Sequence, residues 1–257
     1  MTELFGHCAR SHGRRSARTA GAAIGAVIAT ALFATEPAAD KPEFITESEM
    51  ALIPAYCRDA NTFGYGGTAD SMSPNAPKWV AMMGKGFWAI HHYCWALINL
   101  RRAQGPLVSP MVKQNAREQG IRDLMYVVEH SPSDFILLPE IFTKMGQVQL
   151  ELKRPLEAGV SFGRARAQKP DYWPAYFHWA VHLQNTGQKG KARQFVETGL
   201  AYSPDSAPLR KLLVELGGDP KTVMPKPVPT DSKVDPAAPP DVAAPPDKPP
   251  AKTSTAN

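Results

Sequence analysis

An internal repeat places the strongest constraint on the fold, because two consecutive segments of equal length align with each other without a gap. The first segment is residues 139–172 and the second is residues 173–206. Similar residue types recur at matching positions: Phe142 with Tyr176, Met145 with Trp179, Gly146 with Ala180, Ala158 with Ala192, Phe162 with Val196, Ala165 with Gly199, and Pro170 with Pro204. Large apolar residues at spacings of three and four indicate helices, and the small residues let two helices approach closely. A repeat of this length predicts stacked units that share one core.

This pattern resembles the tetratricopeptide repeat family. The resemblance rests on large apolar residues followed by a small one in the first helix, and on Ala158 and Ala192 in the second helix. Gly187 matches the family's frequent turn glycine, whereas Lys153 stands in that turn in the first unit. The resemblance implies an all-α fold in which antiparallel helical pairs stack into an α-solenoid over residues 78–219.

Segments on both sides of the two full repeats are predicted to extend the stack. After them, residues 208–216 form a helix that would cap the last unit, and Gly217 ends it. Before them, residues 77–103 have apolar side chains at alternating spacings of three and four, which predicts one long helix. A second helix follows the loop at residues 105–110 and ends before Pro132. The sequence therefore predicts three helical pairs and a cap.

The resemblance also implies a binding surface, since tetratricopeptide arrays generally bind peptides or proteins on the concave face formed by the first helix of each pair. The groove residues carried over in this way are Thr143, Gln147, Leu150, Phe177, His178, Val181 and Asn185. The family variant that captures a free C-terminal carboxylate uses Lys and Asn at key positions, where this chain has Thr143, Gln147 and His178. We therefore expect an uncharged or partly apolar peptide.

The N-terminal residues 1–39 have the features of an export signal. Four arginines and one acid within residues 1–34 give a charge of +3, and an uncharged apolar run occupies residues 20–34. This run is shorter than the roughly 20 residues that a spanning helix needs. A signal peptide is predicted, and with it a periplasmic or secreted location. The alternative is an uncleaved, short membrane anchor, and only in that case do we expect membrane binding.

The C-terminal residues 220–257 are rich in proline and contain no aromatic residue. Proline lacks a backbone donor, and a segment without large apolar side chains cannot offset the entropy lost on ordering. A disordered tail is predicted, which acts as a spacer, as a ligand for a partner, or only as a solvated end.

Two cysteines remain if the signal is removed together with Cys8, namely Cys57 and Cys94. Two thiols in an exported chain most simply form one disulfide. It would tie the irregular segment of residues 40–77 to the helical domain. Within that segment, Thr46 and Glu49 have the spacing of a capping box at the start of a short helix.

A soft-metal site for copper or zinc is the alternative for the segment that carries His91, His92 and Cys94. His91 and Cys94 are three residues apart and share a helical face, and Met82, Met83 and Cys57 could complete the ligand set. A second histidine pair, His178 and His182, could also bind metal, although the simpler interpretation is that it lines the groove.

Catalytic and nucleic-acid-binding functions receive no support from the sequence. No motif marks a nucleophile or an acid–base pair, so we expect no enzyme and no cofactor. The net charge of +5 falls to +2 once residues 1–34 are set aside, which disfavours a nucleic-acid binder. The sequence thus predicts an exported scaffold for a protein or peptide partner.

Overall fold

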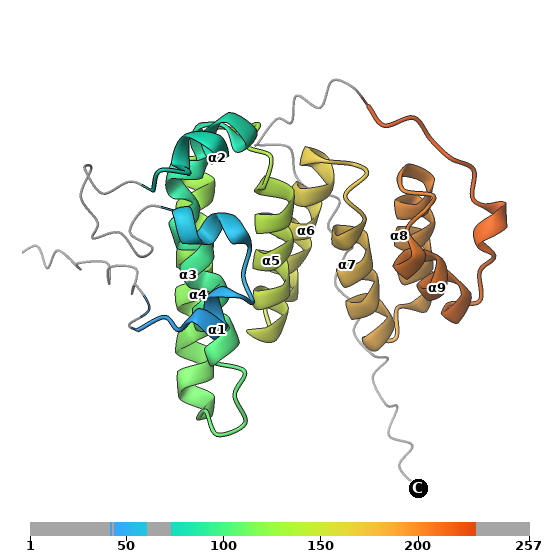
Figure 1. Ribbon diagram of the computed structural model, residues 1–257. Helices are drawn as coiled ribbons and strands as arrows, with labels where there is room; N and C mark the ends of the chain where they lie inside the picture. The colour runs from blue at the N-terminus through green and yellow to red at the C-terminus, as the bar shows by residue number, and fades with distance from the viewer. Residues whose placement is uncertain (1–41, 43, 61–72, 230–257) are drawn as a thin grey trace, which may run out of the picture. The chain divides into compact units, whose positions relative to one another are not determined.

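The computed structural model describes residue 42, residues 44–60 and residues 73–229 (Figure 1). Across these residues, helices account for 70% and there is no strand, which confirms the predicted all-α class. The predicted signal or anchor at residues 1–39 lies outside the described residues, and so does the proline-rich sequence from residue 230 onward. Among the helices described, none combines the length and the hydropathy that a membrane span requires.

The segment before the helical pairs contains α1 (Glu47–Met50) and a 3-10 turn at Ala55–Asp59. The predicted capping box is present: the Thr46 side chain accepts a hydrogen bond from the Glu49 backbone N–H, and the Glu49 carboxylate accepts one from the Thr46 N–H. These two hydrogen bonds satisfy backbone N–H groups at the start of α1, which have no partner within the helix.

The predicted long helix at residues 77–103 is wrong, because the structure divides it into three parts. These are α2 (Ala76–Met83), a 3-10 turn (Lys85–Ala89) and α3 (Ile90–Arg102). Gly84 ends α2 with a φ of +76°, a conformation that favours glycine. Two residues later, Gly86 packs against the ring of Phe135 so closely that a Cβ atom would clash. The break lets the chain pass beside Phe135.

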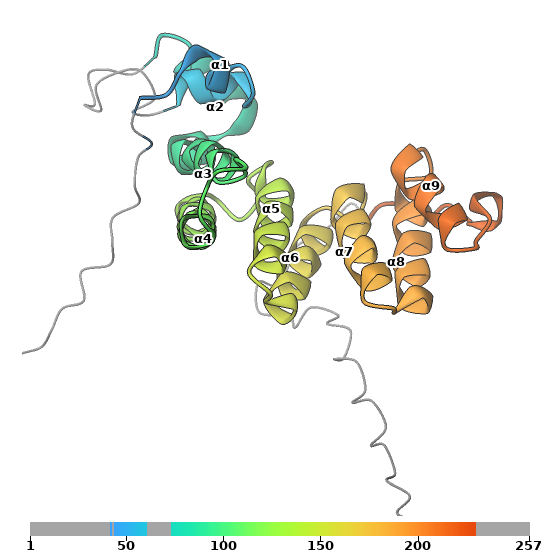
Figure 2. The ribbon, with the colours of Figure 1, turned by 90° about the horizontal axis from the view of Figure 1, so that it is seen from below.

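Three neighbouring helical pairs and a final helix follow one another along the chain (Figures 1 and 2). The pairs are α3 with α4 (Pro110–His130), α5 (Leu138–Glu151) with α6 (Pro155–Gln168), and α7 (Trp173–Asn185) with α8 (Lys189–Tyr202). The last helix, α9 (Ala207–Glu215), packs on α8 at the place predicted for a capping helix.

The repeat of the sequence is also a repeat of the backbone. The end of α5 and both ends of α6 are followed, one repeat length later, by the end of α7 and both ends of α8. The small residues Gly146 and Ala180 are buried, as close helix packing requires. A Cβ atom on Gly146 would lie 2.8 Å from the ring of Phe162, so α5 and α6 meet at the closest distance that their side chains allow.

The structure describes the beginning of the predicted tail, up to residue 229. Residues 220–222 form a 3-10 turn, the Val223 side chain packs against the core, and the Lys226 backbone N–H donates to the Ala201 carbonyl at 2.7 Å. Val223 and this backbone hydrogen bond thus connect the first residues of the predicted tail to the helical domain.

Candidate functional site

A cavity among the described residues lies between α5 and α7 and is bordered by the end of α3 and by α4. Its volume is about 600 Å³, which is in the range of ligand sites in proteins. Two kinds of side chain line it. The apolar ones are Leu100, Ala103, Val148, Leu150 and Val181, and the polar ones are Gln104, Arg117, Lys144, Gln147, Glu151, Lys153, His178, His182 and Asn185. We call this cavity the α5–α7 groove.

Four positions of the repeat line the groove in both units. They are the pairs Lys144 and His178, Gln147 and Val181, Val148 and His182, and Glu151 and Asn185, each separated by one repeat length. Within one helix these positions have spacings of three, one and three, so they form a single face. Two helices with the same orientation thus present the same face to one cavity.

Five of the seven predicted groove residues line this cavity: Gln147, Leu150, His178, Val181 and Asn185. Thr143 and Phe177, which are equivalent in the repeat, do not. Thr143 is buried in the helix packing, and Phe177 packs edge-on against Trp173 with 6.1 Å between ring centroids. The next residues in the sequence, Lys144 and His178, line the cavity instead.

A direct contact joins the two units across the groove. Gln147 Nε2 lies 2.6 Å from Nε2 of His178. Burial lowers the pKa of His178, and the nearby Lys144 ammonium lowers it further. The imidazole is therefore neutral at pH 7, and its Nε2 accepts the hydrogen bond that the Gln147 amide donates.

The charges of the groove are predominantly positive. Arg117 Nε and Glu151 Oε2 form an ion pair at 2.6 Å, which neutralises one cation and the only acid in the lining. Lys144 and Lys153 remain as cationic groups. The sequence-based prediction missed all four of these residues. The signal for Lys144 was present, because it lies one repeat length before the predicted His178.

The segment proposed as a metal site has a different arrangement. The Cys94 sulfur is bonded to that of Cys57, as predicted, with the two Cα atoms 5.7 Å apart, so it is not available as a thiolate ligand. The His92 Nδ1 lies 2.8 Å from the buried Asp123 carboxylate, and its ring stacks on Tyr126. No group of three His, Cys, Asp or Glu side chains among the described residues is placed to hold a metal ion. This packing does not fit the copper or zinc alternative.

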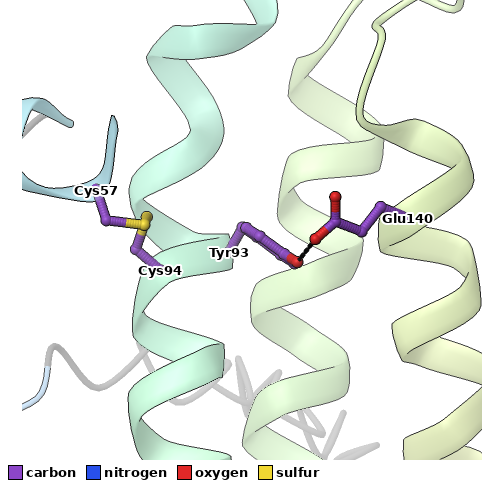
Figure 3. The surroundings of a disulfide bond; sticks show 4 residues. All are labelled: Cys57, Tyr93, Cys94 and Glu140. Atoms are coloured by element: carbon purple, nitrogen blue, oxygen red, sulfur yellow. Dashed lines mark hydrogen bonds between the residues drawn. A yellow bond between two sulfur atoms is a disulfide. The ribbon is translucent and has the colours of Figure 1, made fainter. Parts of the chain in front are cut away.

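Next to the disulfide, a hydrogen bond joins α3 to α5. The Tyr93 hydroxyl donates to the Glu140 carboxylate, and Tyr93 and Cys94 are adjacent in α3 (Figure 3). Burial and the Glu140 charge together raise the pKa of Tyr93 and of Tyr172, in the latter case to about 12. These tyrosines stay protonated, and their environment suits a structural contact rather than proton transfer.

The comparisons with known proteins identify no relative: no family model, no curated protein and no solved structure matches this chain.

Proposed function

We propose that this chain is an exported tetratricopeptide-type scaffold that binds a peptide or a protein segment in the α5–α7 groove. The observation that carries the proposal is the set of four repeat positions that line one cavity from both units. Tandem helical pairs that present equivalent faces to one side form the extended binding surfaces of solenoid proteins.

The lining residues define the chemistry of the ligand. Lys144 and Lys153 favour a ligand with an acidic group, while Leu150 and Val181 favour apolar side chains. The expectation of an uncharged peptide, which was based on positions 143, 147 and 178, is thereby replaced by that of an acidic one, while the expectation of partly apolar character is kept. The Gln147–His178 hydrogen bond fixes two polar groups before the ligand arrives, and a preformed site loses less entropy on binding.

The proposal of export has two supports of different kinds. The sequence of residues 1–39 resembles a signal peptide, and the described part of the chain contains a disulfide. Disulfides form and persist in oxidising compartments.

A peptide selection tests the proposed function. A phage-displayed peptide library is selected on the full chain, and the dissociation constants of the enriched peptides are measured by fluorescence anisotropy. We expect acidic peptides with apolar residues to bind, and Lys144→Glu and Val181→Ser each to weaken binding by about tenfold or more.

The matched control is Leu156→Ser, which replaces an exposed leucine of α6 outside the groove. It should leave the dissociation constants unchanged. Peptides whose affinity is insensitive to both groove substitutions would show that the ligand binds elsewhere and would contradict the proposal.

A further inference from the structure

The turn between α3 and α4 exposes apolar side chains that the fold does not bury. We call residues 105–112 the hairpin tip. Within it, Leu107 is 98% exposed, Met111 70% and Val112 50%. Figure 1 shows this turn beyond the ends of α5 and α6. Several large apolar residues gathered on one projecting turn mark an interaction surface more often than scattered exposed residues do.

The tip is held by its own hydrogen bonds. The backbone N–H groups of Gly105 and Val108 donate to the carbonyls of Arg102 and Gly105, and the Ser109 hydroxyl caps α4 by accepting from the Val112 N–H at 3.3 Å. The exposure of Leu107 and Met111 is therefore a feature of an ordered turn, and these side chains are presented in a fixed arrangement.

The sequence on either side of the tip carries charges of one sign only. The sequence from residue 71 to residue 117 contains no Asp or Glu and six Lys or Arg. Two of the six, Arg102 and Arg117, pair with Glu49 and Glu151. Arg101 and Lys113, which stand on either side of the tip in the sequence, have no ion pair among the described residues.

We infer that the hairpin tip docks on an anionic phospholipid surface, with Leu107 and Met111 entering the interface and with Arg101 and Lys113 at the headgroups. Apolar side chains flanked by cations bind such surfaces through apolar burial and electrostatic attraction to anionic lipids. This contact does not depend on the groove, nor on whether the N-terminal apolar run is retained as an anchor. Because Ala103 and Gln104 border both the groove and the tip, docking would bring the groove close to the membrane surface.

The experiment follows the environment of the tip itself, since the N-terminal apolar run could bind vesicles by its own means. In the full chain with Cys8→Ser, an environment-sensitive fluorophore is attached at Leu107→Cys. The matched control carries it at Leu156→Cys, because Leu156 is 58% exposed and, like Leu107, directly follows a proline. Vesicles of phosphatidylcholine alone are compared with equal mixtures of phosphatidylcholine and phosphatidylglycerol.

We expect a blue shift at position 107 with the mixed vesicles only, quenching of that fluorophore by brominated acyl chains, and reversal at high salt. Position 156 should show none of these changes. Arg101→Gln with Lys113→Gln should abolish the blue shift at position 107 while leaving the circular dichroism spectrum unchanged.

Four results would overturn the inference: no shift at position 107, an equal shift at position 156, an equal response to pure phosphatidylcholine, or a shift without vesicles that grows with protein concentration. The last would assign the tip to a contact between two copies of the chain. Peptide binding in the groove is measured without vesicles, so this inference can fail while the proposed scaffold function stands.

Discussion

Lys153 adopts the left-handed backbone conformation that Gly187 adopts at the equivalent position of the next unit, with φ values of 63° and 80°. The same hydrogen bond closes both turns: the Arg154 N–H donates to the Gln149 carbonyl at 2.9 Å, and the Gln188 N–H donates to the Leu183 carbonyl at 2.8 Å. These are helix ends of the kind at which glycine is strongly preferred. The first unit forms the turn with a lysine, although a side chain makes this conformation unfavourable.

Exchanging these residue types should therefore change the stability in opposite directions. We expect Lys153→Gly to raise the free energy of unfolding by about 0.5–1 kcal/mol, and Gly187→Lys to lower it by a similar amount. Urea denaturation monitored by circular dichroism measures both changes. A loss of stability in Lys153→Gly would mean that contacts of the lysine side chain outweigh the backbone strain.

The contact between Gly146 and Phe162 gives a second prediction. The added methyl group of Gly146→Ala would lie 2.8 Å from a ring that is completely buried and cannot easily move. Overpacking of this kind should lower the free energy of unfolding by about 1–3 kcal/mol. Gly190→Ala is the control, because its Cβ would meet no atom within 4 Å, and it should be neutral or slightly stabilising. Equal effects of the two substitutions would argue against close packing of α5 on α6.

The disulfide between Cys57 and Cys94 should contribute substantially to stability. It closes a loop with a sequence separation of 37 residues, for which the chain-entropy model gives roughly 3–4 kcal/mol. We expect Cys57→Ser with Cys94→Ser to lower the free energy of unfolding by that amount. A reductant should produce the same loss in the wild type and none in the double variant. An unchanged thermal midpoint of the wild type in reductant would contradict the prediction.

The buried His91 should make the protein less stable in acid. Burial lowers its pKa from 6.5 to about 4, and the neighbouring His92 adds to the effect. Between these two values the unfolded chain binds a proton that the folded chain does not, so the stability falls as the pH falls from about 6.5 to about 4. The full contribution is about 3 kcal/mol.

His91→Asn tests this acid sensitivity, since the asparagine amide can still donate to the Trp88 carbonyl that lies 3.1 Å from His91 Nδ1. The stability of the variant should depend less on pH across this window. Burial raises the pKa of Asp123, so this group makes the folded state more stable as the pH falls, opposite to His91. Because both proteins contain Asp123, the difference between their pH dependences reports the contribution of His91. A parallel pH dependence of the two proteins would assign the effect to other groups.

The repeat predicted the helical pairs because close packing of two helices requires small residues at the points of contact. Small residues such as Gly146 and Ala180 must recur wherever two helices approach, so their positions appear in the sequence. The break at Gly84 left no such signal. Apolar spacing continues through it, although Gly84 ends α2 with a positive φ. The close approach of Gly86 to Phe135, which comes after α3 and α4 in the chain, is a contact that the local sequence does not show.

The groove was predicted in part, for a related reason. The resemblance to the tetratricopeptide family implies that the first helix of each pair faces the groove, and His178 and Val181, which were carried over in this way, line the cavity. The resemblance does not fix how each helix is rotated about its axis. The prediction therefore included Phe177, which does not line the cavity, and omitted Lys144, which does. Arg117 comes from α4, and Gln104 comes from the turn between α3 and α4; this pair of helices resembles the repeat less closely, so the register does not place these residues.

The short N-terminal segment is fastened to α3 at two places, covalently through Cys57–Cys94 and ionically through Glu49–Arg102 at 2.5 Å. A protease that cut the chain between Ala60 and Ser73 would therefore not release residues 44–60. The nicked protein would migrate as one species on a gel run without reductant, and it would separate into two fragments only when the sulfur–sulfur bond is reduced.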